Sequence, residues 1–87
     1  MVIYSVEIVP KAEKEYLNLP QSVKKRFQEI ILSLEKDPRP FGSKKLRETD
    51  YYRLRSGDYR IVYSIDDKSR VVKILSVGHR KEIYRSL

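Results

Sequence analysis

The chain has 87 residues, a formal net charge of +7 and no cysteine. This length indicates one small domain with a modest core, spanning residues 1–87. The lack of cysteine excludes disulfides, thiolate nucleophiles and cysteine-based metal sites. No apolar stretch approaches the ~20 residues of a membrane-spanning helix, and no charged segment followed by an apolar signal core begins the chain. We therefore expect a soluble, cytoplasmic protein with no membrane partner.

Residues 2–9 are rich in β-branched and aromatic side chains, which predicts a strand. Residues 10–17 begin with a proline that suits the first turn of a helix, and a Leu-Pro pair separates them from a second helix over residues 21–36. The apolar residues of this second helix recur at helical spacing: Val23, Phe27, Ile30, Ile31 and Leu34. The proline-containing segment 37–42 ends the helix, because a proline disfavours the helical conformation of its predecessor.

Three further strands are predicted over residues 51–55, 59–65 and 71–77, with short turns at residues 56–58 and 66–69. Short turns favour an antiparallel meander. One strand, two helices and three strands are typical of an α+β fold. We expect an N-terminal helical hairpin packed on one face of a four-stranded, mainly antiparallel sheet, with the first strand at an edge.

The positive charge lies in the second half of the chain. Acidic and basic residues balance in residues 1–38, so the whole excess lies in residues 39–87. Such asymmetry favours an anionic partner, which could be nucleic acid, an acidic protein segment or a lipid surface. A basic surface that serves only solubility is an equally common explanation.

Strand alternation indicates where part of this charge gathers. Arg53 and Arg55 lie on one side of their strand, and pairing across the turn brings Arg60 beside them. Any one of these arginines would more often form a surface salt bridge with Glu48, Asp50 or Asp58. Several converging guanidinium groups instead favour a phosphate site, because their planar forks match phosphate oxygens. Two further arginines are candidates for the same site: Arg47 and Arg80.

Residues 77–84 begin at the end of the last predicted strand and contain His79, Arg80 and Tyr84. A lone histidine is commonly only a hydrogen-bonding side chain, and Tyr84 would more often anchor the C-terminus than take part in chemistry. Four more tyrosines lie in the predicted strands, where most should cover the core and one exposed ring could stack on a base: Tyr51, Tyr52, Tyr59 and Tyr63.

Three blocks of the sequence, at residues 44–47, 52–63 and 77–84, resemble the signature blocks of the RelE/ParE toxin superfamily. The Gly-His-Arg…Tyr ending resembles the RelE branch. This resemblance implies a RelE-like fold and the toxin of a type II toxin–antitoxin system, a ribosome-dependent endoribonuclease that cuts mRNA in the ribosomal A site. The implied partners are a RelB-type antitoxin and the ribosome, with operator DNA bound only through the antitoxin complex.

The resemblance also implies roles for individual residues. The residues at catalytic positions are Arg53, Arg60, Arg80 and Tyr84. Those expected to bind RNA around them are Lys45, Arg47, Arg55 and His79. The sequence departs from the best-known bacterial member at Tyr51 and His79, where that member has lysine, and the segment between Arg80 and Tyr84 is shorter.

The chemistry can be considered without the family. With one histidine and no grouped carboxylates we expect neither a metal nor a cofactor. RNA supplies its own nucleophile, the 2′-hydroxyl, so the protein must position the phosphate, offset its charge and assist two proton transfers. Tyr84 or His79 could move a proton. Two alternatives stay open: a non-enzymatic ParE-like toxin that inhibits DNA gyrase, and an inactive relative that only binds its antitoxin or RNA. Arg80 and Tyr84, added to Arg60, favour the nuclease.

Overall fold

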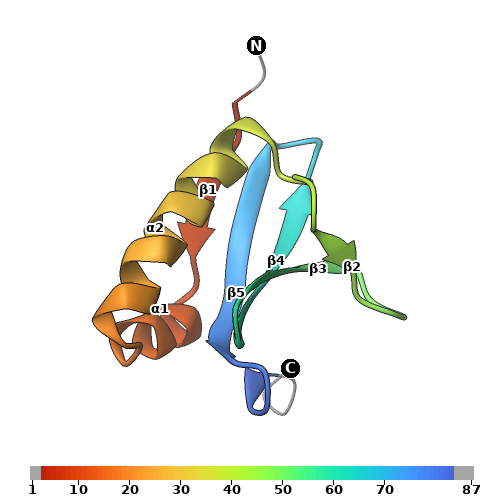
Figure 1. The fold of residues 1–87 in the computed structure, drawn as a ribbon. Helices are drawn as coiled ribbons and strands as arrows, with labels where there is room; N and C mark the ends of the chain where they lie inside the picture. Colours follow the sequence, from red (N-terminus) through yellow and green to blue (C-terminus); the bar gives the residue numbers. More distant parts are fainter. Residues whose placement is uncertain (1–2, 84–87) are drawn as a thin grey trace.

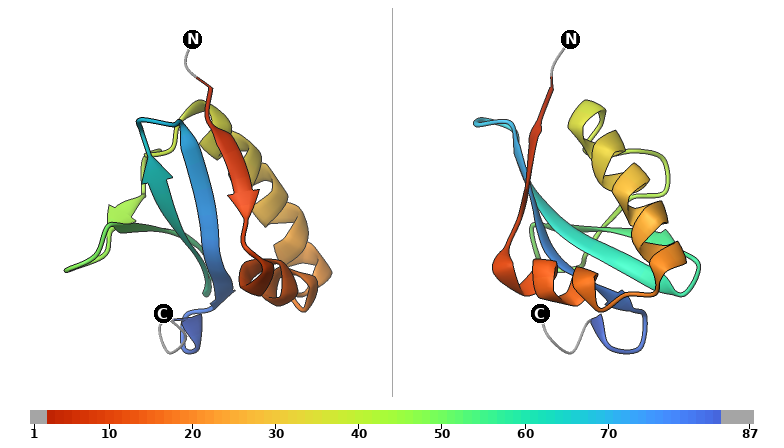
Figure 2. Two further views of the ribbon diagram at one scale, coloured as in Figure 1. Left: turned by 180° about the vertical axis from the view of Figure 1, so that it is seen from behind. Right: turned by 90° about the vertical axis from the view of Figure 1, so that its left-hand side faces the viewer.

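A computed structural model describes residues 3–83 of the chain (Figure 1). In chain order the elements are β1 (Ser5–Ile8), α1 (Pro10–Leu17), α2 (Gln21–Lys36), β2 (Lys44–Lys45), β3 (Tyr51–Ser56), β4 (Tyr59–Asp66) and β5 (Val71–His79). The five strands form one sheet in the order β1-β5-β4-β3-β2. Strand β1 runs parallel to β5, and the other neighbours are antiparallel. Both helices cover the same face of this sheet (Figure 2).

The predicted α+β fold is confirmed, with both helices over the predicted residues and β1 at an edge of the sheet. The sheet has five strands rather than the predicted four, because the two-residue strand β2 pairs with β3. Two lysines carry no alternation that would mark a strand. They become a strand only because β3 supplies hydrogen-bonding partners, which a local pattern does not contain.

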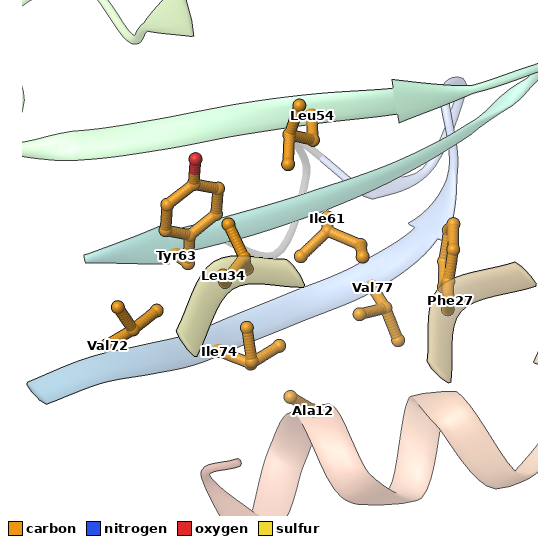
Figure 3. Close-up of a cluster of buried hydrophobic side chains, with 9 residues drawn as sticks. All are labelled: Ala12, Phe27, Leu34, Leu54, Ile61, Tyr63, Val72, Ile74 and Val77. Carbon is orange, nitrogen blue, oxygen red and sulfur yellow. The ribbon is translucent and has the colours of Figure 1, made fainter. Parts of the chain in front are cut away.

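The core lies between the helices and the sheet (Figure 3). From α2, Phe27 and Leu34 are fully buried, as their helical spacing predicts, and each such side chain stabilises the fold by roughly 1.5–3 kcal/mol. From α1, Ala12 points toward Ile74 of β5, and its small side chain allows the helix to approach the strand closely. The sheet contributes the remaining buried residues of this cluster: Leu54, Ile61, Tyr63, Val72, Ile74 and Val77.

Helix α1 also protects the outer edge of β5. Pairing between β1 and β5 ends at Ile8 and Ile74, which leaves the later residues of β5 without a strand on that side. Glu15 of α1 accepts hydrogen bonds there from Ser76 Oγ at 2.9 Å and from Val77 N at 3.2 Å. An open strand edge is therefore satisfied by a side chain of the helix.

An aromatic and ionic cluster fixes the segment between α2 and β2. Tyr63 donates a hydrogen bond from its hydroxyl to Pro38 O at 2.8 Å, and its ring stacks on Tyr52 with the centroids 5.9 Å apart. Arg39 lies over the Tyr52 ring and binds both carboxylate oxygens of Asp67 at 3.1 and 2.9 Å. These contacts hold the chain in place as it enters the edge strand β2.

Candidate nucleic-acid interface

Three arginines lie on the sheet face opposite the helices, and we call Arg53, Arg55 and Arg60 the arginine face. Leu54 and Ile61 belong to the core, so their neighbours along each strand point the other way. Arg55 is paired directly with Arg60 across β3 and β4, and Arg53 is paired with Val62, two residues further along. The register thus brings together the arginines that strand alternation predicts to be neighbours.

Arg60 is the most unusual member of this face. It is only 9% exposed, and one terminal nitrogen donates to Gly57 O at 3.0 Å and to Tyr59 O at 3.2 Å. Among the residues that the structure describes, no carboxylate forms an ion pair with it. A buried charge without a counter-ion is costly, and a bound anion would remove that cost.

Surface salt bridges of Arg53, Arg55 and Arg60 with the nearby acids, the alternative to a phosphate site, are not formed within residues 3–83. Asp50 instead lies 4.0 Å from Lys45 Nζ, and Asp58 lies 3.8 Å from Arg80 Nε. Glu48 forms no ion pair with a described residue. Within the described residues, none of the three arginines of the arginine face forms an ion pair.

The turn between β3 and β4 accepts hydrogen bonds from both Arg60 and Arg80. Gly57, the first residue of this two-residue loop, has φ of +60°, a conformation that glycine adopts without strain. Gly57 O accepts from the Arg60 guanidinium, while Asp58 O accepts from the backbone N of Arg80 at 2.7 Å. The Arg80 side chain remains 54% exposed.

His79 lies on the other side of the sheet. It pairs with Tyr59 at the end of β5, and its ring meets that core-packed tyrosine edge to face, with centroids 5.5 Å apart. It lines a cleft of about 460 Å³ together with residues of the α1–α2 turn, among them Leu19 and Pro20. Cross-strand partners share a face, so the histidine is separated from the arginine face by the sheet itself.

The register distinguishes the two lysines of β2. Lys44 is paired with Arg53, whereas Lys45 is paired with Tyr52, which packs against the core. Lys44 therefore shares the arginine face and Lys45 points to the opposite side. Lys45 is the lysine that the sequence predicts to bind RNA, and that remains a prediction. The position of Lys44 beside Arg53 could not be predicted, because no signal showed that these residues form a strand. Arg47 is exposed in the loop after β2 and is outside the sheet.

Tyr84 lies outside the described residues. The chain up to it is anchored by Ile83, which is almost completely buried. Within residues 3–83 no three acidic or histidine side chains are grouped as metal ligands. None of the helices described there is long and apolar enough to cross a membrane.

Residues 6–84 match the protein family described as the ParE toxin of the type II toxin-antitoxin system, parDE. The mRNA interferase toxin RelE of Escherichia coli K12 is 32% identical over 85 residues, which cover 93% of this chain and 90% of that protein. Toxin RelG of Mycobacterium tuberculosis is 33% identical over 84 residues, which cover 94% of this chain and 97% of that protein.

A solved structure resembles the fold over nearly its whole length. The archaeal RelE-RelB complex from Pyrococcus horikoshii OT3 contains a chain that superimposes with a TM-score of 0.81 at 39% identity. The match covers 94% of the present chain and 99% of the other. The structural match and the sequence matches therefore cover the same, nearly complete part of the chain.

Proposed function

This chain belongs to the RelE/ParE superfamily of type II toxins, and we propose that it is a ribosome-dependent endoribonuclease that cuts mRNA in the ribosomal A site and inhibits translation. One observation carries the proposal: Arg60 is a buried guanidinium with no described counter-ion, paired with Arg55 and held to the same turn as Arg80. An RNA phosphate is a matching anion, because guanidinium forks bind phosphate oxygens in pairs.

The reaction needs only the groups of the RNA and the protein. The 2′-oxygen attacks the adjacent phosphorus and the bond from phosphorus to the 5′-oxygen breaks, giving a 2′,3′-cyclic phosphate and a 5′-hydroxyl. A base takes the 2′-hydroxyl proton, and the leaving oxygen receives a proton. Arg53, Arg60 and Arg80 offset the negative charge that develops on the phosphate, which is worth most where the donors are already in position.

In this proposal Tyr84 takes the proton of the 2′-hydroxyl, and the leaving 5′-oxygen receives a proton from solvent. A free tyrosine has a pKa near ~10, so it acts as a base only if nearby guanidinium charge favours the phenolate. His79 is a weaker candidate, because the sheet separates it from the arginine face. It is better suited to hold the strand end against Tyr59 than to meet the RNA.

The proposed partners follow from the relatives and from the charge. Solved relatives are complexes of RelE with RelB, so we expect a RelB-type antitoxin whose acidic segment neutralises the arginine face. The ribosome presents the A-site mRNA, and operator DNA is bound only through the antitoxin complex. All of these partners are found in the cytoplasm.

A second candidate is a ParE-like toxin that inhibits DNA gyrase without enzymatic activity. It is favoured by the description of the matching family, which names the ParE toxin. A gyrase inhibitor has no need for a buried Arg60 that lacks a counter-ion among the described residues. The RNA-cleaving function therefore explains more of the site.

The two candidates are separated by adding the protein to a translating extract and mapping mRNA ends by primer extension. We expect codon-phased cuts, reduced about 100-fold by Arg80→Ala, since loss of one donor to the developing charge costs about this much. Lys25→Ala, which removes an exposed charge from α2, is the matched control and should cut like the wild type. Intact mRNA combined with blocked supercoiling by gyrase would sink the nuclease in favour of the ParE-like function.

A further inference from the structure

Two side chains flank Arg53 on the arginine face, and the first is Tyr51. It lies two residues before Arg53 on β3 and is paired with Ser64 of β4, so both residues point away from the helices. Tyr52, Tyr59 and Tyr63 pack against the core. Tyr51 is half-buried, and neither its ring nor its hydroxyl has an aromatic or hydrogen-bonding partner among the described residues.

The second flanking side chain is Lys44, the cross-strand partner of Arg53 in β2. It is exposed and forms no ion pair within residues 3–83. Its neighbour Lys45 has the same charge, points to the opposite face and lies near Asp50. Among residues 3–83, strand β2 thus has one cation without an ion pair on the arginine face and one cation near a carboxylate on the other face.

These positions place a ring and two cations within reach of a single nucleotide. Same-face residues along a strand are about 7 Å apart, and cross-strand side chains are about 5 Å apart at Cβ. The residue opposite Tyr51 is Ser64, whose small side chain covers less of the ring than a larger one would. Aromatic rings beside cations on a sheet are how many proteins hold single-stranded RNA, with the base on the ring and the phosphate on the cation.

We propose that Tyr51 and Lys44 form a nucleotide subsite beside the cleavage position, in which a base of the mRNA stacks on Tyr51 and a phosphate binds Lys44. The subsite rests on the proposed function and adds to it a contact for the nucleotide next to the cut. The negative charge of an acidic antitoxin segment matches Lys44 alone. RNA uses both groups.

The test measures kcat/KM for cleavage on ribosomes programmed with an mRNA, and with mRNAs that have an abasic nucleotide at one A-site position at a time. Tyr51→Leu should lower kcat/KM about 10-fold on the intact codon, and Tyr51→Phe, which keeps the ring, should stay near the wild type. At one A-site position, an abasic nucleotide should lower the kcat/KM of the wild type by a similar factor. The same mRNA should not lower the kcat/KM of Tyr51→Leu any further, because the stacking contact is already lost in that variant.

Lys44 is tested against an exposed lysine of α2 in the same assay. Lys44→Ala should lower kcat/KM several-fold and make cleavage less sensitive to salt, because one phosphate contact is lost, while Lys25→Ala, which removes an exposed charge from α2, should match the wild type. Wild-type rates for Tyr51→Leu and Lys44→Ala would overturn the subsite. The subsite would also be overturned if Tyr51→Leu lowered kcat/KM by the same factor on every abasic mRNA as on the intact one. A Lys44→Ala variant that lost only antitoxin binding would overturn it as well. Failure of the wild type to cleave would instead defeat the proposed function.

Discussion

Arg60 combines a full positive charge with a nearly buried side chain, and its hydrogen bonds run only to backbone carbonyl oxygens. The carbonyl groups orient the guanidinium without neutralising it. A lysine there would keep the charge but not the planar fork that matches a phosphate. In the proposed reaction, a guanidinium held in this way would meet the phosphate with little rearrangement, which favours electrostatic stabilisation of the transition state.

Tyr63 shows the opposite use of a polar group, as a structural anchor. It is fully buried in the core, and its hydroxyl is committed to Pro38 O at 2.8 Å. Burial raises the pKa of Tyr63 to about 12 from its ordinary value of 10.0. The folded protein therefore keeps a proton that the unfolded chain would release at lower pH.

Tyr63→Phe should lower the free energy of unfolding by about 1–2 kcal/mol at neutral pH, because a buried carbonyl loses its donor. The stabilisation from the raised pKa is complete below pH 10 and is lost as the pH rises from about 10 to about 12. The difference in the free energy of unfolding between wild type and variant, measured by urea unfolding, should therefore decrease over this pH range. Tyr51→Phe, whose hydroxyl has no described partner, is the control, and a gap independent of pH would contradict the assignment.

At the scale of elements, α1 replaces a strand at the edge of the sheet. Strand β1 covers β5 only as far as Ile74. Beyond that point Glu15 accepts hydrogen bonds from both Ser76 and Val77, and Lys11 bridges to the same carboxylate at 3.1 Å. The helix therefore stabilises the end of β5, from which the chain continues to Arg80.

Glu15→Ala should destabilise the protein by about 1–3 kcal/mol, because a partly buried backbone N–H and a hydroxyl both lose their acceptor. Glu15→Gln, which keeps an acceptor oxygen, should fall between Glu15→Ala and the wild type. Glu13→Ala, an exposed change on the same helix, serves as the control in urea unfolding. Equal stability of the Glu15→Ala and Glu13→Ala variants would mean that apolar packing alone holds α1 to β5.

At the scale of the whole molecule, Asp67 joins three parts of the chain that are distant in sequence. It lies in the β4–β5 turn and accepts hydrogen bonds from Arg39, before β2, and from the hydroxyl of Tyr4, before β1, the latter at 2.6 Å. The Arg39 guanidinium, and then the Tyr4 hydroxyl, lower the pKa of Asp67 to about 2. The carboxylate form is thus favoured by the fold.

The stabilisation from Asp67 is present above its ordinary pKa of 3.8 and is lost as the pH falls toward about 2. We expect the wild-type melting temperature to decrease more steeply between pH 4 and pH 2 than that of Asp67→Asn, as measured by circular dichroism. Asp50→Asn, which removes an acid whose only described ion pair is the 4.0 Å contact with Lys45, should keep the wild-type slope. Parallel curves for wild type and Asp67→Asn would refute the linkage.

Local periodicity was enough to predict both helices, the three consecutive strands and the convergence of Arg53, Arg55 and Arg60. Each of these depends on side-chain direction within one element or across one tight turn, and such directions repeat every 3.6 or 2 residues. The sequence also contains the blocks that identify the family. Its arginine pattern alone was enough to suggest an anionic ligand.

Long-range pairing decided the rest. The strand β2 exists only because β3 lies beside it, and the pairing directs Lys44 toward the arginine face and Lys45 away from it. The same register turns His79 toward the helices. Whether an arginine has a counter-ion depends on acids brought near by the fold, and within the described residues Arg60 has none. Register and burial join residues that are distant in the chain, so no local pattern contains them.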